Sequence, residues 1–345
     1  MPIVNGAYEA PTWNNDAPPA INAAELQDIC DMIETYNTSK ADVSYVNTFV
    51  RPNLLDNGYF VGGGSQQGGG QFPINQQGMT TYTGIKYTID RWKIEGGDST
   101  ANVALTSSGI TINGGTGATN FFRQKTDLFL TGKVCTWSVL TADGILYSKT
   151  GTVVASGVSA YLGTPFGNIR INSGGSSPGS TDCGISICVD KGKTVSVVAA
   201  KLEIGDTQTL AHQENGAWVL NEVPNYQQEL AKCQRYFIKL GYRSGSTYLS
   251  PIGSGYASSA TSFRVMIPLP VTMRTSPSIE YVGTYNVSAF RAINGGNAIP
   301  LTDISFVYHN DGVLAIGTVE TGLTANEIYL LQFNSSYGFY LSAEL

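Results

Sequence analysis

Apolar and polar residues alternate in short stretches along most of the chain, with the period of two that is typical of β-strands. Residues 87–94, 134–140 and 185–189 are examples. Turn signals such as Asn113-Gly114-Gly115 interrupt these stretches about every 8–12 residues. The pattern predicts a mainly β chain. No repeat of fixed period is present, so the stacked coils of a β-helix are not expected.

The strand pattern falls into two blocks, each long enough for a sandwich of two sheets. The first block, residues 53–206, predicts a jelly-roll-like β-sandwich domain. The domain is expected to start with the segment at 53–60, and its last strand is expected at 194–204. The Gly- and Gln-rich tract at 62–70 interrupts the first strand region and is expected to be a loop.

Residues 207–240 are expected to connect this domain to a second, C-terminal β-sandwich domain at 241–345. The connector contains a helical segment at 226–237, which Asn225 is positioned to cap. The strands expected in the second domain lie at 263–269, 278–282, 305–308, 313–319 and 327–333.

A helical period occurs near the N-terminus, after an extended attachment arm at residues 1–20 that is rich in Pro and Asn. Asn22 is a good N-cap and Glu25 follows three residues later, which predicts a short helix over 21–40 and then a linker at 41–52. Four residues of this helix form a heptad seam for oligomerisation: Leu26, Ile29, Ile33 and Tyr36. The seam favours a trimeric stalk, and a helix docked on its own domain is the alternative.

Composition narrows the class of protein. Charged residues make up 13% of the 345 residues, and the chain contains 40 Gly and 19 Tyr. It is therefore too aromatic to be disordered and too poor in charge to be a helical bundle. With a net charge of −6 and no cluster of Lys and Arg, it is not expected to bind nucleic acid. Its apolar stretches are shorter than the ~20 residues of a membrane helix, so membrane insertion is not expected.

Residue types that carry catalysis or bind metals are sparse. The two His, His212 and His309, lack metal-ligand or triad spacing, and no G-x-S-x-G motif is present. The five Cys are scattered and odd in number, which predicts packing roles. No catalytic residue, metal site or cofactor is expected. A Ca²⁺ site on the loops and a hydrolytic carboxylate pair stay open, because oxygen ligands leave little trace in a sequence and the chain has 26 Asp and Glu.

Four groups of residues resemble the modular tail fibres and related tail-tip proteins of bacteriophages and prophages. The first is the lead-in from Trp13 to Leu26. The second is Asn53-Leu-Leu-Asp-Asn-Gly-Tyr-Phe60 together with the segment at 87–93. The third and fourth are the segment at 200–206 and the pair of segments at 230–237 and 268–277. The motifs are short, but together they touch every segment of the chain.

The resemblance implies a homotrimeric adhesive component of the virion, located in the tail or tail tip. Residues 1–40 would attach it to the baseplate or to another tail protein. The first domain would be similar to a carbohydrate-binding module, and residues 241–345 would recognise a host cell-surface glycan. The N-terminus lacks the features of a secretory signal, which agrees with synthesis in the bacterial host cytoplasm.

Two other functions stay open beside receptor binding. One is a structural virion protein without a receptor site, such as a baseplate component or a head fibre. The other is a polysaccharide depolymerase, although no enzyme is expected from the residues present.

Glycan binding needs aromatic faces that stack on sugar rings and polar groups that bond to hydroxyls. Trp92 and Trp137 lie inside strand-like stretches and are expected in the core instead. The candidate ligand-binding residues of the C-terminal domain are Tyr242, Arg243, Tyr248, Tyr256, Tyr285, Phe290, Arg291 and Tyr308.

Overall fold

A computed structural model of the chain describes residues 3, 4, 7, 8, 31, 50–62, 72–175, 177, 183–240, 250–282, 287–309, 311–333 and 338–344. The chain divides into two compact units, residues 1–51 and 52–345. In the first unit, strands β1 (Ile3–Val4) and β2 (Ala7–Tyr8) form an antiparallel pair. The seam residues Leu26, Ile29, Ile33 and Tyr36 lie outside the described residues, so the stalk stays a prediction.

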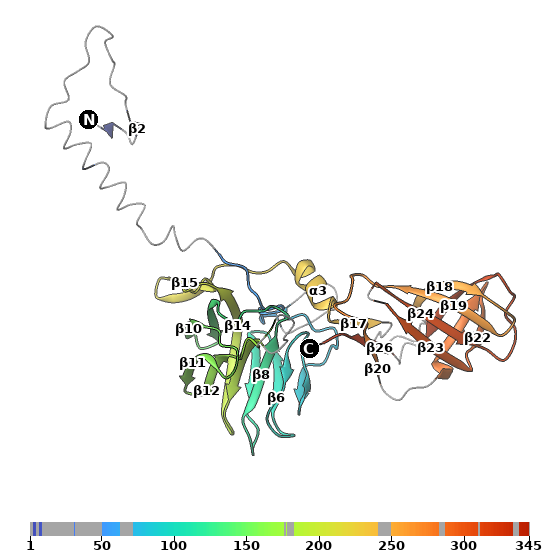
Figure 1. Ribbon diagram of the computed structural model, residues 1–345, viewed down its shortest axis with the longest axis horizontal. Coiled ribbons are helices and arrows are strands. Elements are labelled where there is room, and N and C mark those ends of the chain that lie inside the picture. Colours follow the sequence, from blue (N-terminus) through green and yellow to red (C-terminus); the bar gives the residue numbers. More distant parts are fainter. Residues whose placement is uncertain are drawn as a thin grey trace, which may run out of the picture. The chain divides into compact units, whose positions relative to one another are not determined.

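The second unit begins with a sandwich of two six-stranded antiparallel sheets, drawn in cyan to yellow-green in Figure 1. One sheet has the order β10-β9-β14-β7-β6-β3. Its strands are β3 (Thr81–Thr83), β6 (Asn102–Thr106), β7 (Gly109–Asn113), β9 (Val134–Thr141), β10 (Leu146–Thr152) and β14 (Thr194–Ile204). The other has the order β11-β12-β13-β8-β5-β4. Its strands are β4 (Lys86–Tyr87), β5 (Lys93–Ile94), β8 (Asn120–Lys125), β11 (Ser159–Thr164), β12 (Gly167–Ile171) and β13 (Gly184–Val189).

The facing sides of these sheets bury one apolar core. Phe122 lies in register with Ile94 and Ile187, and all three side chains are buried. Trp92 and Trp137 are fully buried in the same core, and the Trp92 ring stacks on Phe122 with centroids 4.8 Å apart. The expected β-sandwich and the expected core tryptophans are therefore confirmed.

The expected strand at 87–94 is wrong, because the chain reverses inside it. The backbone N–H of Thr88 donates to the Trp92 carbonyl, and that of Trp92 donates to the Ile89 carbonyl. Arg91 adopts a positive φ of 72°. Alternation of apolar and polar residues here reflects a tight buried turn that joins β4 to β5.

The connector after the first sandwich holds more structure than expected. Strands β15 (Ala211–Glu214) and β16 (Ala217–Leu220) form a hairpin that packs against Leu140 and Ala199 of the first sandwich. Helix α3 (Tyr226–Gln234) follows, and the Asn225 side chain accepts a hydrogen bond from the Gln228 N–H. The helix ends before the expected residue 237, because Phe237 already pairs with Ser342 in a sheet.

A second sandwich, drawn in orange and red in Figure 1, is built from a three-stranded and a seven-stranded antiparallel sheet. The first has the order β17-β26-β20, with β17 (Phe237–Leu240), β20 (Ser278–Val282) and β26 (Gly338–Ser342). The second has the order β22-β21-β25-β18-β19-β24-β23. Its strands are β18 (Ser250–Ala257), β19 (Ser262–Pro268), β21 (Phe290–Asn294), β22 (Asn297–Pro300), β23 (Asp303–Tyr308), β24 (Gly312–Thr318) and β25 (Ile328–Phe333), and a 3₁₀ turn, Val287–Ala289, precedes β21.

The five strands expected in this domain are present, and β17, β18, β21, β22 and β26 were missed. Residues of both sheets, such as Phe339 and Val265, share one buried core. The expected second sandwich is therefore confirmed, although it begins at residue 237 rather than 241.

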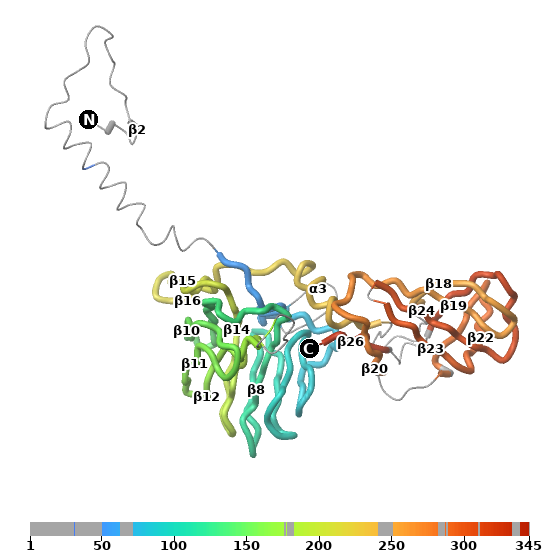
Figure 2. The backbone as a smooth tube through the Cα atoms, viewed as in Figure 1, coloured from blue at the N-terminus to red at the C-terminus, as the bar shows by residue number. Residues whose placement is uncertain are grey.

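A buried ionic cluster joins the two sandwiches. The Arg91 guanidinium forms ion pairs with Asp56, at 3.2 Å, and with Glu344, at 2.5 Å. Its Cζ lies 3.4 Å from the centroid of the Tyr236 ring. Figure 2 shows the red C-terminal end of the chain beside the cyan segment of the first sandwich, as the Arg91–Glu344 pair requires. Residues 52–345 are thereby held as one compact unit.

Candidate functional site

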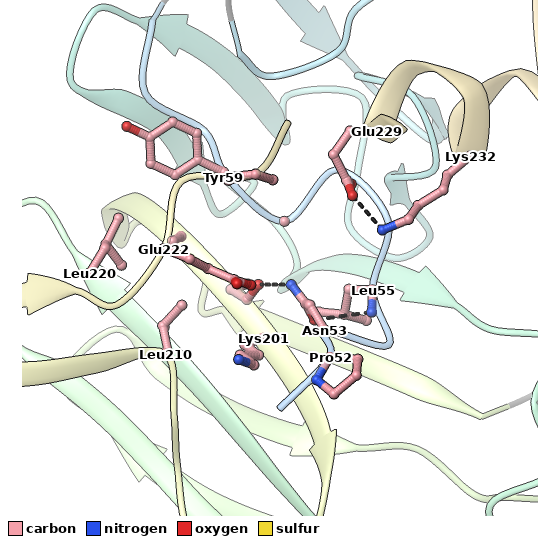
Figure 3. Close-up of a pocket in the computed structure, with 14 residues that line it drawn as sticks. Pro52, Asn53, Leu55, Tyr59, Lys201, Leu210, Leu220, Glu222, Glu229 and Lys232 are labelled. Atoms are coloured by element: carbon pink, nitrogen blue, oxygen red, sulfur yellow. Dashed lines mark hydrogen bonds and ion pairs between the residues drawn. The ribbon is translucent and has the colours of Figure 1, made fainter. Parts of the chain in front are cut away.

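A cavity of about 160 Å³ lies between the first sandwich, the hairpin and helix α3 (Figure 3). Several of its polar side chains are engaged with other side chains or with the backbone. Lys232 donates to Glu229 at 2.5 Å, Lys201 donates to Thr209 at 2.9 Å, and Asn53 donates to the Ala200 carbonyl at 3.0 Å. The cavity is also smaller than the roughly 300–1,000 Å³ of ligand pockets. We therefore assign these side chains to packing between the elements.

A second candidate region is a row of mostly polar and cationic side chains on the sheet β11-β12-β13-β8-β5-β4. It lies on the side of the sheet that faces away from the core. Lys93 lies in register with Tyr87 and Arg123, and Ser186 lies in register with Arg123 and Arg170. Directly opposed residues share one side of a sheet, so these five side chains form a row across five strands. We call Lys93, Arg123, Lys125 and Arg170 the cationic face.

Three polar groups on strand β12 and just after it are buried without a hydrogen-bond partner among the described residues. They are Asn168 Oδ1, Arg170 Nε and Asn172 Nδ2, which alternate along the chain and therefore lie on the same side of the sheet. Asn172 is only 9% exposed, and its Oδ1 accepts a hydrogen bond from Ser186. Buried polar groups in native proteins are nearly always bonded, so these three atoms give this surface hydrogen-bonding capacity that the described residues do not use.

The charges of the cationic face are unevenly paired. Glu95 accepts a hydrogen bond from Arg123 and lies 3.6 Å from the Lys125 ammonium. The Arg170 guanidinium lies 5.3 Å from the centroid of the Phe121 ring. No carboxylate of the described part of the chain pairs with Arg170.

An aromatic side chain borders the face at the edge strand β11. A β-bulge between Ser159 and Leu162 places Ala160 and Tyr161 opposite Arg170. Tyr161 is 55% exposed. A bulge at a sheet edge commonly re-aims a side chain, and here an exposed ring occupies a strand position opposite Arg170.

At its other end the face runs into a cleft of about 400 Å³, within the range of ligand pockets. Tyr87 and Lys93 line both the cleft and the cationic face. The remaining walls come from both sandwiches, and the full lining is Gln77, Lys86, Tyr87, Lys93, Phe237, Glu280, Tyr340, Ser342 and Glu344. Register places Tyr340 opposite Glu280 and Ser342 opposite Phe237, so one side of the three-stranded sheet faces the cleft.

Burial shapes the acid–base behaviour of the cleft. It raises the pKa of the Glu344 carboxyl, although the Arg91 guanidinium opposes the shift. Burial also raises the pKa of the Tyr87 hydroxyl, and the nearby Glu344 carboxylate adds to that effect. Tyr87 is therefore a neutral hydrogen-bonding group at physiological pH.

No protein-family model, curated protein or solved structure matches this chain.

The ligand-binding residues expected from the sequence are not brought together. Tyr242, Arg243, Tyr248 and Tyr285 lie outside the described residues. Phe290 is 3% exposed and packs against Phe306 and Phe339, so we withdraw it as a ligand-binding candidate. Tyr308 is half-buried and packs against the same core.

Tyr256 and Arg291 are exposed on the outer side of the seven-stranded sheet, but they are not neighbours. Tyr256 opposes Ile328 on β25, whereas Arg291 opposes Gln332, four residues further along that strand. The offset of four residues along β25 alone is about 13 Å, and β25 also lies between the two strands that carry them. The surface between them is apolar rather than polar, with Ile328 70% and Leu330 39% exposed.

The sequence also raised questions about the cysteines, a metal site and membrane insertion. The four described cysteines, Cys135, Cys183, Cys188 and Cys233, are buried free thiols, as their expected packing role requires. Among the described residues no group of three or more His, Cys, Asp or Glu could hold a metal ion. Within the same residues, no helix is long and apolar enough to cross a membrane.

Sequence reasoning missed the cationic face and the cleft. The alternation of β8 does place Phe121, Arg123 and Lys125 on one side, opposite Phe122 in the core. However, the face exists only because β5, β8, β13 and β12 lie side by side, and that order does not follow the chain.

Proposed function

We propose that this protein is a glycan-binding adhesive component of a phage or prophage tail, and that the glycan binds to the cationic face and the adjoining cleft. The observation that carries the glycan-binding part is the set of buried polar atoms without a hydrogen-bond partner on β12 and just after it, beside the half-buried cations of the cationic face. The tail context rests on the resemblance of the sequence motifs. Host recognition is thus proposed for the first sandwich, instead of the C-terminal domain that the sequence favoured.

The residue types on this surface suit a carbohydrate. Amide groups of Asn168 and Asn172 are of the kind that bond to sugar hydroxyls, and Gln77 supplies a third in the cleft. The rings of Tyr87 and Tyr340 line the cleft, and aromatic rings stack on the apolar side of a sugar ring. A row that crosses five strands extends for about 19 Å, which fits a chain of sugars better than a single one.

The proposed assembly is a homotrimer attached to the baseplate or another tail protein through residues 1–40. An apolar row across all seven strands of the larger sheet supports self-association. Register aligns Ala298, Ile293, Leu330, Ser254, Met266, Leu314 and Val307 in that row. Six of its seven members are apolar, and monomeric proteins rarely expose a contiguous apolar surface of this extent. Three copies would convert weak glycan sites into avid binding.

Adhesion is favoured over polysaccharide hydrolysis. Two carboxylates, Glu280 and Glu344, line the cleft, as a glycosidase would need. Glu344, however, is bound to Arg91 at 2.5 Å in the buried joint between the sandwiches. A carboxylate committed to a structural ion pair is poorly suited to act as a catalytic acid or nucleophile.

Binding of the purified full chain to an array of bacterial surface polysaccharides tests the proposal. The chain is expected to bind at least one glycan. Tyr161→Ala and Asn172→Ala are then expected to lower its affinity about tenfold, because each removes a contact worth roughly 1–1.5 kcal/mol. Tyr256→Ala, on the second sandwich, is the matched control and is expected to bind like the native chain.

Three results would count against parts of the proposal. Loss of binding in Tyr256→Ala alone would move the site to the second sandwich. Shortening of the polysaccharide during incubation, measured by size-exclusion chromatography, would favour a depolymerase. Failure to retain any glycan, together with antibodies that label the virion away from the tail tip, would favour a purely structural protein.

A further inference from the structure

The cationic face carries an excess of positive charge on a chain that is acidic as a whole. Four cations share the face with one carboxylate, Glu95, whereas the chain has a net charge of −6. Glu95 is already bound to Arg123 and Lys125. Arg170 and Lys93 therefore have no carboxylate partner among the described residues.

From this arrangement we infer that the ligand is an anionic glycan, with carboxylate or phosphate groups along its chain. The inference rests on the proposed function and specifies its ligand class. A neutral glycan would leave the Arg170 guanidinium, whose Nε is buried, without a counter-charge. Burial of an unpaired charge is unfavourable, and an anion from the ligand removes that cost.

The geometry of the two cations fits repeated negative charges rather than one. Lys93 on β5 and Arg170 on β12 are separated by β8 and β13, which is three strand spacings or about 14 Å. One small anion cannot reach both. A guanidinium binds carboxylate and phosphate through two parallel hydrogen bonds, whereas the Lys93 ammonium acts as a point charge.

The same features argue against a nucleic acid as the ligand. Nucleic-acid sites neutralise many consecutive phosphates with a dense basic surface. Here four cations lie on an acidic chain, and Glu95 lies among them. The Asn168 Oδ1 and Asn172 Nδ2 atoms, which have no hydrogen-bond partner among the described residues, match hydroxyl-rich sugars instead.

The test compares the affinity of the full chain for four soluble probes at several salt concentrations. Polygalacturonate carries carboxylates, poly(glycerol phosphate) carries phosphates, dextran is neutral, and single-stranded DNA represents nucleic acid. At least one of the two anionic probes is expected to bind about tenfold more tightly than dextran, with an affinity that falls as salt is raised. A difference between polygalacturonate and poly(glycerol phosphate) identifies which anion the site prefers.

Charge-removing variants locate the site. Arg170→Gln and Lys93→Gln are each expected to weaken binding of the anionic probe about tenfold and to reduce its dependence on salt. Lys149→Gln is the matched control, because Lys149 is an exposed lysine on β10 in the other sheet of the same sandwich. It is expected to bind like the native chain, and circular dichroism is expected to be unchanged in all three.

Each of the other possible outcomes would overturn a specific part of the two proposals. Equal affinity for dextran and the anionic probes would overturn the anionic ligand while leaving glycan binding intact. Binding of none of the four probes would overturn both proposals. Tighter binding of the DNA than of either anionic polymer would replace the glycan by a nucleic acid. Equal losses in Lys149→Gln and Arg170→Gln would show that the overall charge of the protein, and not the cationic face, drives binding.

Discussion

At the scale of single residues, the joint between the two sandwiches depends on buried charges. Asp90 accepts hydrogen bonds from the backbone N–H of Gln76, at 2.8 Å, and from its side chain, at 2.5 Å. The same Gln76 amide donates to the Phe237 carbonyl of the second sandwich, at 2.7 Å. Arg91, the next residue, binds Asp56 and Glu344. A short turn of the first sandwich therefore holds the second one in place.

Asp90 is expected to make the stability of the chain depend on pH. Burial raises the pKa of the Asp90 carboxyl to about 7, against the opposing hydrogen bonds from Gln76. Between about pH 4 and 7 the folded chain therefore holds a proton that the unfolded chain releases, and the free energy of unfolding falls as pH rises. One such proton contributes a slope of about 1.4 kcal/mol per pH unit at most.

Urea unfolding at a series of pH values measures this slope. Asp90→Asn is expected to flatten it, and the slope that remains comes from Asp56 and Glu344, whose pKa values burial also raises. Asp303→Asn, at an exposed position, is the control and is expected to keep the native slope. A stability that rises with pH in the native chain over this range would contradict the assignment.

Arg91→Met is expected to destabilise residues 52–345 by about 3–5 kcal/mol, because it leaves the buried Glu344 and the half-buried Asp56 carboxylates without their cation. The loss is expected to be smaller at pH 5 than at pH 8, since protonation removes the unpaired charges. Adding Glu344→Gln to Arg91→Met is expected to restore part of the stability. Lys149→Met, at an exposed position, serves as the control in the same urea titrations.

At the scale of elements, glycines decide where strands approach closely. Strand β18 contains Gly253 and Gly255 and pairs with both β25 and β19. A Cβ at Gly255 would lie 1.8 Å from the Arg264 carbonyl oxygen, and one at Gly253 would lie 2.6 Å from the Met266 oxygen. The strand therefore needs residues of low β-propensity at its centre, which explains why the sequence pattern concealed it.

Gly255→Ala is expected to destabilise the second sandwich by about 1–3 kcal/mol, because backbone atoms of β19 must move to admit the methyl group. Gly163→Ala on β11 is the matched control, since no atom lies within 4 Å of the added Cβ. Its effect is expected to stay within about 0.5 kcal/mol. Equal unfolding midpoints for the two variants in urea would show that β18 is not closely packed.

At the scale of the whole molecule, the two sandwiches expose opposite kinds of surface. The outer side of one six-stranded sheet carries the cationic face, whereas the outer side of the seven-stranded sheet carries an apolar row across its strands. Met266 is 52% exposed and Ile328 70% exposed on the apolar side. Six strand spacings of about 4.8 Å make that sheet about 29 Å wide, wide enough to contribute to an interface between copies.

In sedimentation velocity, the double variant Met266→Asp/Leu330→Asp is expected to have a lower molar mass than the native assembly. Charges placed in the centre of an apolar interface remain unpaired there and oppose association. Val223→Asp is the matched control, because Val223 is 64% exposed but lies outside this sheet. A native chain that is monomeric at micromolar concentration, or a double variant with unchanged mass, would rule out this surface as an interface.

The sequence alone determined the class of fold and much of its core. Alternation identified the strand at 263–269, and Trp137 is buried in the strand that its stretch predicted. These features are local, because a period of two and a turn signal depend on a few consecutive residues. Alternation also misled at 87–94, where a buried turn carries the same pattern as a strand.

Only the tertiary structure decided where the candidate site lies. Lys93, Arg123 and Arg170 come from three strands that are distant in sequence, and pairing across the sheet aligns them in one row. Phe290 was chosen for its ring, but its strand turns that ring into the core beside Phe339. Strand order and register arise from long-range pairing, which a sequence pattern does not encode, whereas the side of a strand that each residue occupies follows from its neighbours along the chain.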